Sequence, residues 1–526
     1  MTLKAPFYPI VYIRGFAATL GEIEETVATP YMGFNLGSTK IRQDHKGGIV
    51  RFIFESPLIR LMKDEGYVDT YANGDLLPPG TRSPARSIWI FRYYEPMSQS
   101  LGSGERREIL AIAADLRAFV LRIRDQVCGD DPRARAAFRV YLVGHSMGGL
   151  IARAYLQNLC VNGTGDARRD SALELPGVHL VDKVFTYGTP HGGIEFRGLN
   201  VPDLGRLDPF HVRNFNRDAM RAYLNLPPDA DVRSLNECFP PERFFCLVGS
   251  NYRDYTAFFN LSRKGTGPMS DGLVMIRNAA VREAPRAVVH RSHSGHYGLV
   301  NSEEGYQNLR RFLFGQWRVD ALLRVATLTL PAPLEKIKRQ GREIRAAYYI
   351  ECQGRVRGAP YHLHERRVDQ SSAIRREYDE LVKDGKPVYL FSAYLDRRAK
   401  TGAPGRALAF ALRIAVQVPL YEVDRRFWFD EYFEGGYLFD ETLTFHLQPG
   451  GGVRYGLASS HGMGVATRRP DREALAGGGS RYVIPLGFPA GAARPPRPGL
   501  RGELLLEVTP WNRESSGESS EEAAPA

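Results

Sequence analysis

Apolar runs of strand length recur along the first 316 residues of the chain. They lie at residues 9–14, 88–93, 138–143, 184–187, 244–249 and 286–289. Runs that are apolar almost throughout predict buried strands, because a half-exposed strand alternates polar and apolar positions. Apolar residues at helical spacing follow at 150–159 and again at 306–313. The second of these helices is predicted to begin after a cap at Ser302 and to end at Gly315.

Beyond about residue 318, apolar residues occupy every second position instead. The alternation is clearest at residues 344–352, 408–418, 443–447 and 504–508. It predicts half-buried strands of an antiparallel, sandwich-like domain, which a helical piece at 371–382 interrupts. The chain is too long for one core, so we expect two domains, residues 1–318 and 319–512. Residues 513–526 are expected to form a disordered tail.

A serine lies at the end of the third apolar run. The run at 138–143 continues directly into Gly144-His145-Ser146-Met147-Gly148, and a predicted helix follows. A serine on a tight turn between a strand and a helix has a strained backbone, and the two glycines leave room for the chain to reverse. Its hydroxyl group is then exposed beside the positive end of the helix dipole. This context predicts that Ser146 is a nucleophile rather than part of an ordinary turn.

Three other segments accompany this motif. They are Arg14-Gly15-Phe16 after the first strand, Gly188-Thr189-Pro190-His191-Gly192 after the fourth, and Ser270-Asp271-Gly272-Leu273-Val274 after the fifth. With the serine motif, they resemble the α/β-hydrolase family over about residues 6–316, in particular its lipase and esterase branch. The resemblance implies an α/β fold, a mostly parallel sheet with helices on both faces. It also implies ester hydrolysis by a Ser-His-Asp triad through an acyl-enzyme, without a metal or organic cofactor.

The resemblance assigns roles to particular residues. Asp271 is the expected acid, and the backbone amides of Phe16 and Met147 are the expected donors of the oxyanion hole. Family members usually carry His-Gly where this chain has Arg14-Gly15, which changes the local hydrogen bonding but not the backbone donor. Asp254 is the rival acid, although it follows Arg253 and is interpreted more simply as a surface ion-pair partner.

Three histidines follow the last predicted strand, where a triad of this order needs its base. They are His290, His293 and His296. We favour His293, because it follows Asp271 by 22 residues, as in the resembling lipases, and has serine on both sides. His296 is the alternative base, and His290 is expected to be a packed or rim residue. His191 precedes the acid in the chain, so we expect it to fix the loop at the mouth of the site.

Two segments exceed what the hydrolase core requires. Residues 17–87 and 194–242 both carry apolar side chains among polar ones. One interpretation is a cap or lid that shapes an acyl pocket, and the other is additional core of a large domain.

Charge and cysteine content bear on possible partners, disulfides and metal sites. The net charge of +11 comes mostly from scattered arginines without a nucleic-acid-binding module, so no nucleic-acid partner is expected. A solvated basic surface and attraction to an anionic membrane surface both stay open. Five cysteines without paired spacing indicate neither a disulfide framework nor a zinc site. The sequence does not indicate an oligomeric state.

The N-terminus carries no features of a secretory signal, and no apolar run approaches the about 18 residues of a membrane span. We therefore expect a soluble, cytoplasmic protein, with signal-independent export as the alternative. Residues 425–429, Arg-Arg-Phe-Trp-Phe, suit a membrane interface or packing against the hydrolase domain. The expected function is a lipase-type carboxylic-ester hydrolase. The alternatives are a phospholipase or other acyl hydrolase at membranes and, outside enzymes, an inactive hydrolase-fold binding protein.

Overall fold

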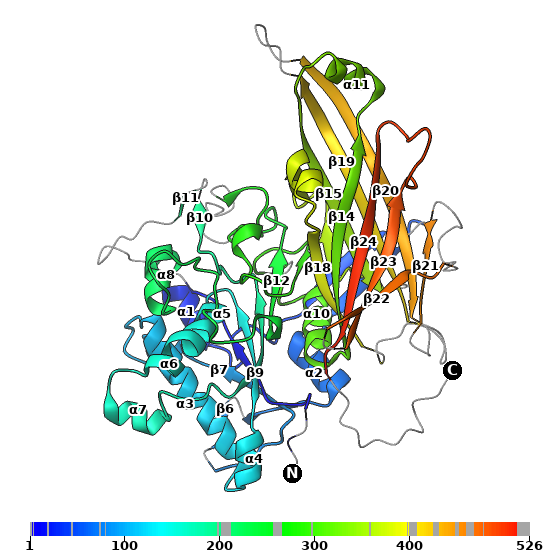
Figure 1. The fold of residues 1–526 in the computed structure, drawn as a ribbon. Coiled ribbons are helices and arrows are strands. Elements are labelled where there is room, and N and C mark those ends of the chain that lie inside the picture. The colour runs from blue at the N-terminus through cyan, green and yellow to red at the C-terminus, as the bar shows by residue number, and fades with distance from the viewer. Residues whose placement is uncertain are drawn as a thin grey trace. The chain divides into compact units, whose positions relative to one another are not determined.

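The chain divides into two compact units, Met1–Arg286 with Arg291–Phe314, and Ala287–His290 with Gly315–Ala526. A computed structural model shows the course of both (Figure 1). The structure describes residues 3, 5–17, 20–43, 46–72, 75–78, 80–196, 199–200, 212–255, 266–295, 298–356, 359–396, 398, 408–423, 431–447, 452–458, 468–476 and 478–512.

Seven strands before residue 290 form one parallel sheet. Its order is β13 (Arg286–Val289), β12 (Phe244–Gly249), β9 (Val181–Tyr187), β8 (Val140–His145), β1 (Ile10–Ile13), β7 (Ser87–Phe91) and β4 (Val68–Asp69). The central strands are buried throughout, as their apolar sequences predict. The register pairs Ile13 with Gly144, so the loops that leave β1 and β8 begin side by side.

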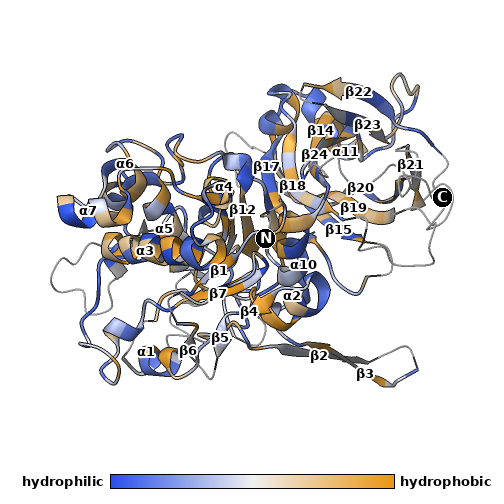
Figure 2. Cartoon of the chain, turned by 90° about the horizontal axis from the view of Figure 1, so that it is seen from below, coloured by the Kyte–Doolittle hydropathy of each residue, from blue (hydrophilic) through white to orange (hydrophobic). Residues whose placement is uncertain are grey.

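Helices cover both faces of this sheet (Figures 1 and 2). On one face lie α3 (Ile109–Cys128) and α5 (Met147–Ala154), which contact each other. On the other lies α10 (Glu303–Phe314), whose Phe312 packs on Phe185 and Phe245 with ring centroids 5.9 and 5.4 Å apart. The cap predicted for α10 is confirmed, because the Ser302 hydroxyl accepts a hydrogen bond of 3.1 Å from the Gly305 amide. The α/β class predicted for this region is therefore confirmed.

The two long insertions differ in structure. The first contains α1 (Leu20–Val27), a hairpin of β2 (Ser38–Gln43) and β3 (Ile49–Phe54), α2 (Pro57–Glu65), β4 and the short pair β5 (Tyr71–Ala72) and β6 (Asp75–Leu76). The second contains β10 (Glu195–Phe196), β11 (Leu199–Asn200), a 3-10 turn at Val212–Phe215 and α8 (Arg217–Tyr223). Phe215, Met220 and Leu224 are buried there. Residues 201–211 lie outside the described part, so a cap or lid stays a proposal.

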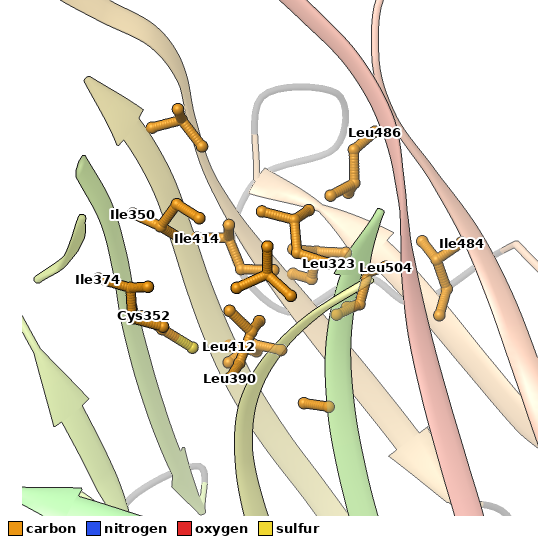
Figure 3. Close-up of a cluster of buried hydrophobic side chains, with 14 of the residues drawn as sticks. Leu323, Ile350, Cys352, Ile374, Leu390, Leu412, Ile414, Ile484, Leu486 and Leu504 are labelled. Atoms are coloured by element: carbon orange, nitrogen blue, oxygen red, sulfur yellow. The ribbon is translucent and has the colours of Figure 1, made fainter. Parts of the chain in front are cut away.

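The second unit contains two antiparallel sheets. One has the order β18 (Val388–Leu395), β14 (Trp317–Thr329), β24 (Gly499–Pro510), β23 (Gly479–Gly487), β22 (Asp471–Leu475). The other has the order β16 (His364–Arg366), β15 (Ile344–Val356), β19 (Leu408–Val423), β20 (Glu431–Leu447), β21 (Val453–Leu457), and β17 (Ile374–Glu377) also pairs with β15. Leu323 and Leu504 of the first sheet share one core with Ile350 and Ile414 of the second (Figure 3). Shared burial between two sheets is the property of a sandwich.

The alternating segments predicted as strands lie within β15, β19, β20 and β24, so those predictions are confirmed. The helix predicted at 371–382 is wrong. Residues Ile374–Glu377 form a strand paired with β15, and only Asp379–Lys383 form a short π-helical turn. Ile374 is 5% exposed and pairs with Ile350, so pairing and burial override the local helical spacing.

Some predicted features lie outside the described residues. They are the aromatic and basic segment 425–429 and the tail 513–526. Within the part that is described, no helix has the length and apolar character needed to cross a membrane.

Candidate active site

Ser146 occupies a strained turn between β8 and α5. Its φ of 51° and ψ of −122° lie in a region that residues with a side chain rarely adopt. The glycine two residues later is required by space, because a Cβ atom at Gly148 would lie 2.2 Å from the carbonyl oxygen of Ile13. The Thr189 hydroxyl donates a hydrogen bond of 2.8 Å to the Ser146 carbonyl and helps to hold the turn. The backbone geometry predicted for the serine motif is therefore present.

Three of the predicted site residues lie in one hydrogen-bonded chain. His293 Nε2 is 2.9 Å from Ser146 Oγ, and His293 Nδ1 is 2.8 Å from Asp271 Oδ2. The side chains are buried, with 3% of Ser146, 3% of His293 and none of Asp271 exposed. A carboxylate only accepts hydrogen bonds, so Nδ1 carries the proton and Nε2 is free to accept from the serine hydroxyl. This is the arrangement that activates a serine for attack on a carbonyl group.

The Asp271 carboxylate is fixed by its own loop. Its Oδ1 accepts hydrogen bonds from the amides of Leu273 at 3.0 Å and Val274 at 2.8 Å. The carbonyl oxygen of Asp271 also accepts a hydrogen bond of 3.0 Å from the amide of His293. Side chain and backbone of the acid therefore both determine where the imidazole lies.

The alternative residues lie elsewhere. His290 is half-buried where β13 ends, and His296 lies outside the described residues. Asp254 is exposed and accepts a hydrogen bond of 2.6 Å from the Asn251 amide group. His191 is fully buried, with Nε2 at 3.2 Å from the Thr186 hydroxyl, and burial lowers its pKa well below the ordinary value. The part expected of His191, fixing the loop at the mouth of the site, stays a prediction.

The predicted oxyanion loop lies directly against the serine turn. A Cβ atom at Gly15 would approach Ser146 Cβ to 2.8 Å, so only glycine fits there. The Tyr94 hydroxyl donates to the Gly15 carbonyl at 2.9 Å and accepts from the Ala17 amide at 2.7 Å. These two bonds fix the peptide groups on either side of Phe16.

Arg14 replaces the usual histidine of this loop and has a partner of its own. Its guanidinium group donates to the carbonyl oxygen of Met32, which ties the loop to the segment after α1. Met147, the second expected donor, is the first residue of α5. The first amides of a helix have no acceptor within the helix, so this amide is available to a ligand.

The sequence did not identify several residues that support the site. Tyr94 is one, and His145 is another, because its Nε2 donates a hydrogen bond of 2.9 Å to the carbonyl oxygen of His293. Burial, with a smaller effect of His293, lowers the pKa of His145 to about 3, so its imidazole is neutral at neutral pH. In the sequence, the available signals for these two residues were the position of His145 inside the serine motif and the position of Tyr94 just after a core strand.

Comparisons with known proteins give distant similarities. No protein-family model matches the chain, and no curated protein matches it. Among solved structures, the lipase BlEst2 of Bacillus licheniformis in its mature form shares 15% identity over 57% of this chain and 89% of that chain, with a TM-score of 0.28. The propeptide form of BlEst2 shares 12% identity over 86% of this chain and 97% of that chain, with a TM-score of 0.29. Phospholipase PlaB from Legionella pneumophila shares 11% identity over 81% of this chain and 90% of that chain, with a TM-score of 0.31.

These identities and TM-scores are low, so the fold is assigned from strand order and site geometry. The sheet is parallel, and the serine follows its central strand β8 on a strained turn. The acid follows β12 and the histidine follows β13, in the chain order serine, acid, histidine. The first unit of this chain has the α/β-hydrolase fold.

Proposed function

We propose that this protein is a lipase-type serine hydrolase that cleaves carboxylic esters. The observation that carries the proposal is the buried chain of hydrogen bonds from Ser146 through His293 to Asp271. The same chain counts against an inactive binding protein, because each of the three groups has the partner that turnover requires.

The reaction follows from these contacts. His293 accepts the Ser146 proton as Oγ attacks the ester carbonyl, and Asp271 stabilises the imidazolium that forms. The amides of Phe16 and Met147 stabilise the negative charge on the carbonyl oxygen, at about 3 kcal/mol for each donor. His293 then protonates the departing alcohol. Water, activated by the same imidazole, releases the acid from Ser146.

An acyl group is the part of the substrate that this site suits. Phe215, from the second insertion, packs edge-to-face on the ring of Phe16, with centroids 5.6 Å apart. Phe215 is buried and Phe16 is half-buried, so apolar rings adjoin the expected oxyanion donor. The Arg106 guanidinium group also lies 5.4 Å from the Phe16 ring centroid. The two aromatic rings beside the expected oxyanion donor favour a hydrocarbon chain in the acyl group.

Labelling by a fluorophosphonate probe tests the proposal. The probe should modify Ser146 alone, and Ser146→Ala should lose both labelling and hydrolysis of nitrophenyl esters while it remains folded. Ser87→Ala is the matched control, because Ser87 is equally buried and its hydroxyl accepts a hydrogen bond from Trp89. Labelling of another serine, or full activity of Ser146→Ala, would refute the triad. A series of acyl-chain lengths then defines the preferred substrate.

A further inference from the structure

The hairpin of β2 and β3 is not part of the seven-stranded sheet of the first unit. The register runs from Ser38 paired with Phe54 to Gln43 paired with Ile49, and these two strands form a sheet of their own. An isolated two-stranded hairpin in water has little stability of its own, which favours a further surface that covers it.

Apolar side chains on this element are exposed. Ile49 is 72% exposed and Ile53 is 71% exposed, and Leu36, just before the hairpin, is 56% exposed. Residues four apart on a strand share a face, so both isoleucines lie on one side of β3. Large aliphatic groups gathered on one exposed face indicate an interaction site.

The amino-acid sequence of the hairpin region indicates the chemistry of its partner. Residues 38–54 contain four basic residues, Lys40, Arg42, Lys46 and Arg51, and one acidic residue, Asp44. Isoleucines combined with an excess of basic residues suit a surface that is apolar below and anionic above. An anionic lipid layer has this composition, because acyl chains accept the isoleucines and headgroups attract the cations.

The base of the hairpin is tied to the candidate active site. Just before it, Met32 accepts the hydrogen bond from Arg14, and the ring of Phe34 packs on Tyr12 of β1 at 4.8 Å. At its other end Phe54 is buried, with its ring 6.1 Å from that of Tyr306 in α10. Arg14 precedes Gly15, so the hairpin is joined to the loop that lies against Ser146.

We propose that the β2–β3 hairpin is the element by which this protein docks onto an anionic lipid surface, with Ile49 and Ile53 entering the layer. This proposal rests on the proposed function for its substrate class, since a hydrolase of lipid esters has to reach its substrate at an interface.

The test compares two properties of the full chain. Binding is measured by co-sedimentation with phosphatidylglycerol vesicles, and catalysis is measured on a soluble short-chain nitrophenyl ester. The double variant Ile49→Gln/Ile53→Gln should bind these vesicles about tenfold more weakly or worse, because the aliphatic groups no longer transfer into the layer. Its activity on the soluble ester should stay within about twofold of wild type. Val178→Gln is the matched control, because Val178 is 67% exposed in a loop elsewhere, and this variant should change neither property.

Further arms separate the outcomes. Wild type should bind phosphatidylcholine vesicles more weakly than anionic ones, and Lys46→Glu should weaken only the anionic binding. Unchanged vesicle binding by the double variant would overturn the proposal. A wild-type dimer that becomes monomeric in the double variant, with vesicle binding intact, would also overturn it in favour of self-association. Vesicle binding does not require turnover, so Ser146→Ala should bind vesicles as well as wild type does. This variant therefore separates a failure of the docking proposal from a failure of the proposed function.

Discussion

The Tyr94 hydroxyl donates a hydrogen bond of 2.9 Å to the carbonyl oxygen of Gly15, the residue before the expected oxyanion donor. The Tyr94 hydroxyl oxygen also accepts a hydrogen bond of 2.7 Å from the amide of Ala17, the residue after that donor. The Tyr93 hydroxyl also donates to the Gly15 carbonyl, at 3.2 Å, but Tyr94 bonds the peptide groups on both sides of Phe16. An oxyanion donor stabilises charge only if it is aimed before the reaction begins, so Tyr94 is a positioning residue.

Removal of this hydroxyl should affect kcat more than KM. Tyr94→Phe is expected to lower kcat about tenfold, because the hydroxyl that joins the Gly15 carbonyl to the Ala17 amide is lost, and to change KM less than twofold. Tyr67→Phe is the control, because Tyr67 is also buried and its hydroxyl donates at 2.8 Å to the carbonyl of Tyr8, away from Ser146. Both variants should lose about 1 kcal/mol of stability. An equal effect of both on kcat would reduce Tyr94 to a structural role.

Alanine substitutions at the three histidines test the choice of base. His293→Ala should lower kcat about 10⁴-fold, because only its Nε2 lies at 2.9 Å from Ser146 Oγ among the described residues. His290→Ala and His296→Ala should each retain activity within about tenfold of wild type. Steady-state kinetics on one soluble ester is the measurement. Severe loss at His296 with a tolerant His293 would transfer the role of base to His296.

The choice of acid is tested by two asparagine variants. Asp271→Asn is expected to lower kcat by about 10³- to 10⁴-fold, because an amide cannot stabilise the protonated imidazole and favours the wrong tautomer. Asp254→Asn should keep nearly full kcat, since Asp254 is exposed and accepts a hydrogen bond from the Asn251 side chain. Comparable losses at both positions would contradict the assignment of Asp271.

The sequence predicted the parts of the site that are local in the chain. Ser146 could be identified because the strand, the glycines and the helix that define its motif are its immediate neighbours in the sequence. Asp271 and His293 were found from their resemblance to family segments, since their contact joins loops 22 residues apart. The bond from Tyr94 to Gly15 spans 79 residues and exists because β7 lies beside β1 in the sheet, which no local pattern indicates. For the same reason the pairing of Ile374 with Ile350 was missed.

The pH dependence of stability tests the neutral state of His145. Its pKa is about 3 in the folded protein, against an ordinary value of 6.5 that applies to the unfolded chain. Below pH 6.5 the unfolded chain therefore binds a proton that the folded protein does not bind, and the free energy of unfolding falls. The stability from this group is complete above pH 6.5 and is lost as the pH falls towards 3. Between pH 6.5 and 4.5 the free energy of unfolding should drop by about 2–3 kcal/mol from this residue.

His145→Gln isolates this contribution, because glutamine can donate to the carbonyl oxygen of His293 without titrating. Urea unfolding followed by fluorescence should give similar midpoints for variant and wild type at pH 8. At pH 4.5 the variant should be the more stable of the two, since other titrating groups are common to both proteins. Parallel loss of stability in both proteins would show that His145 is not held neutral by burial.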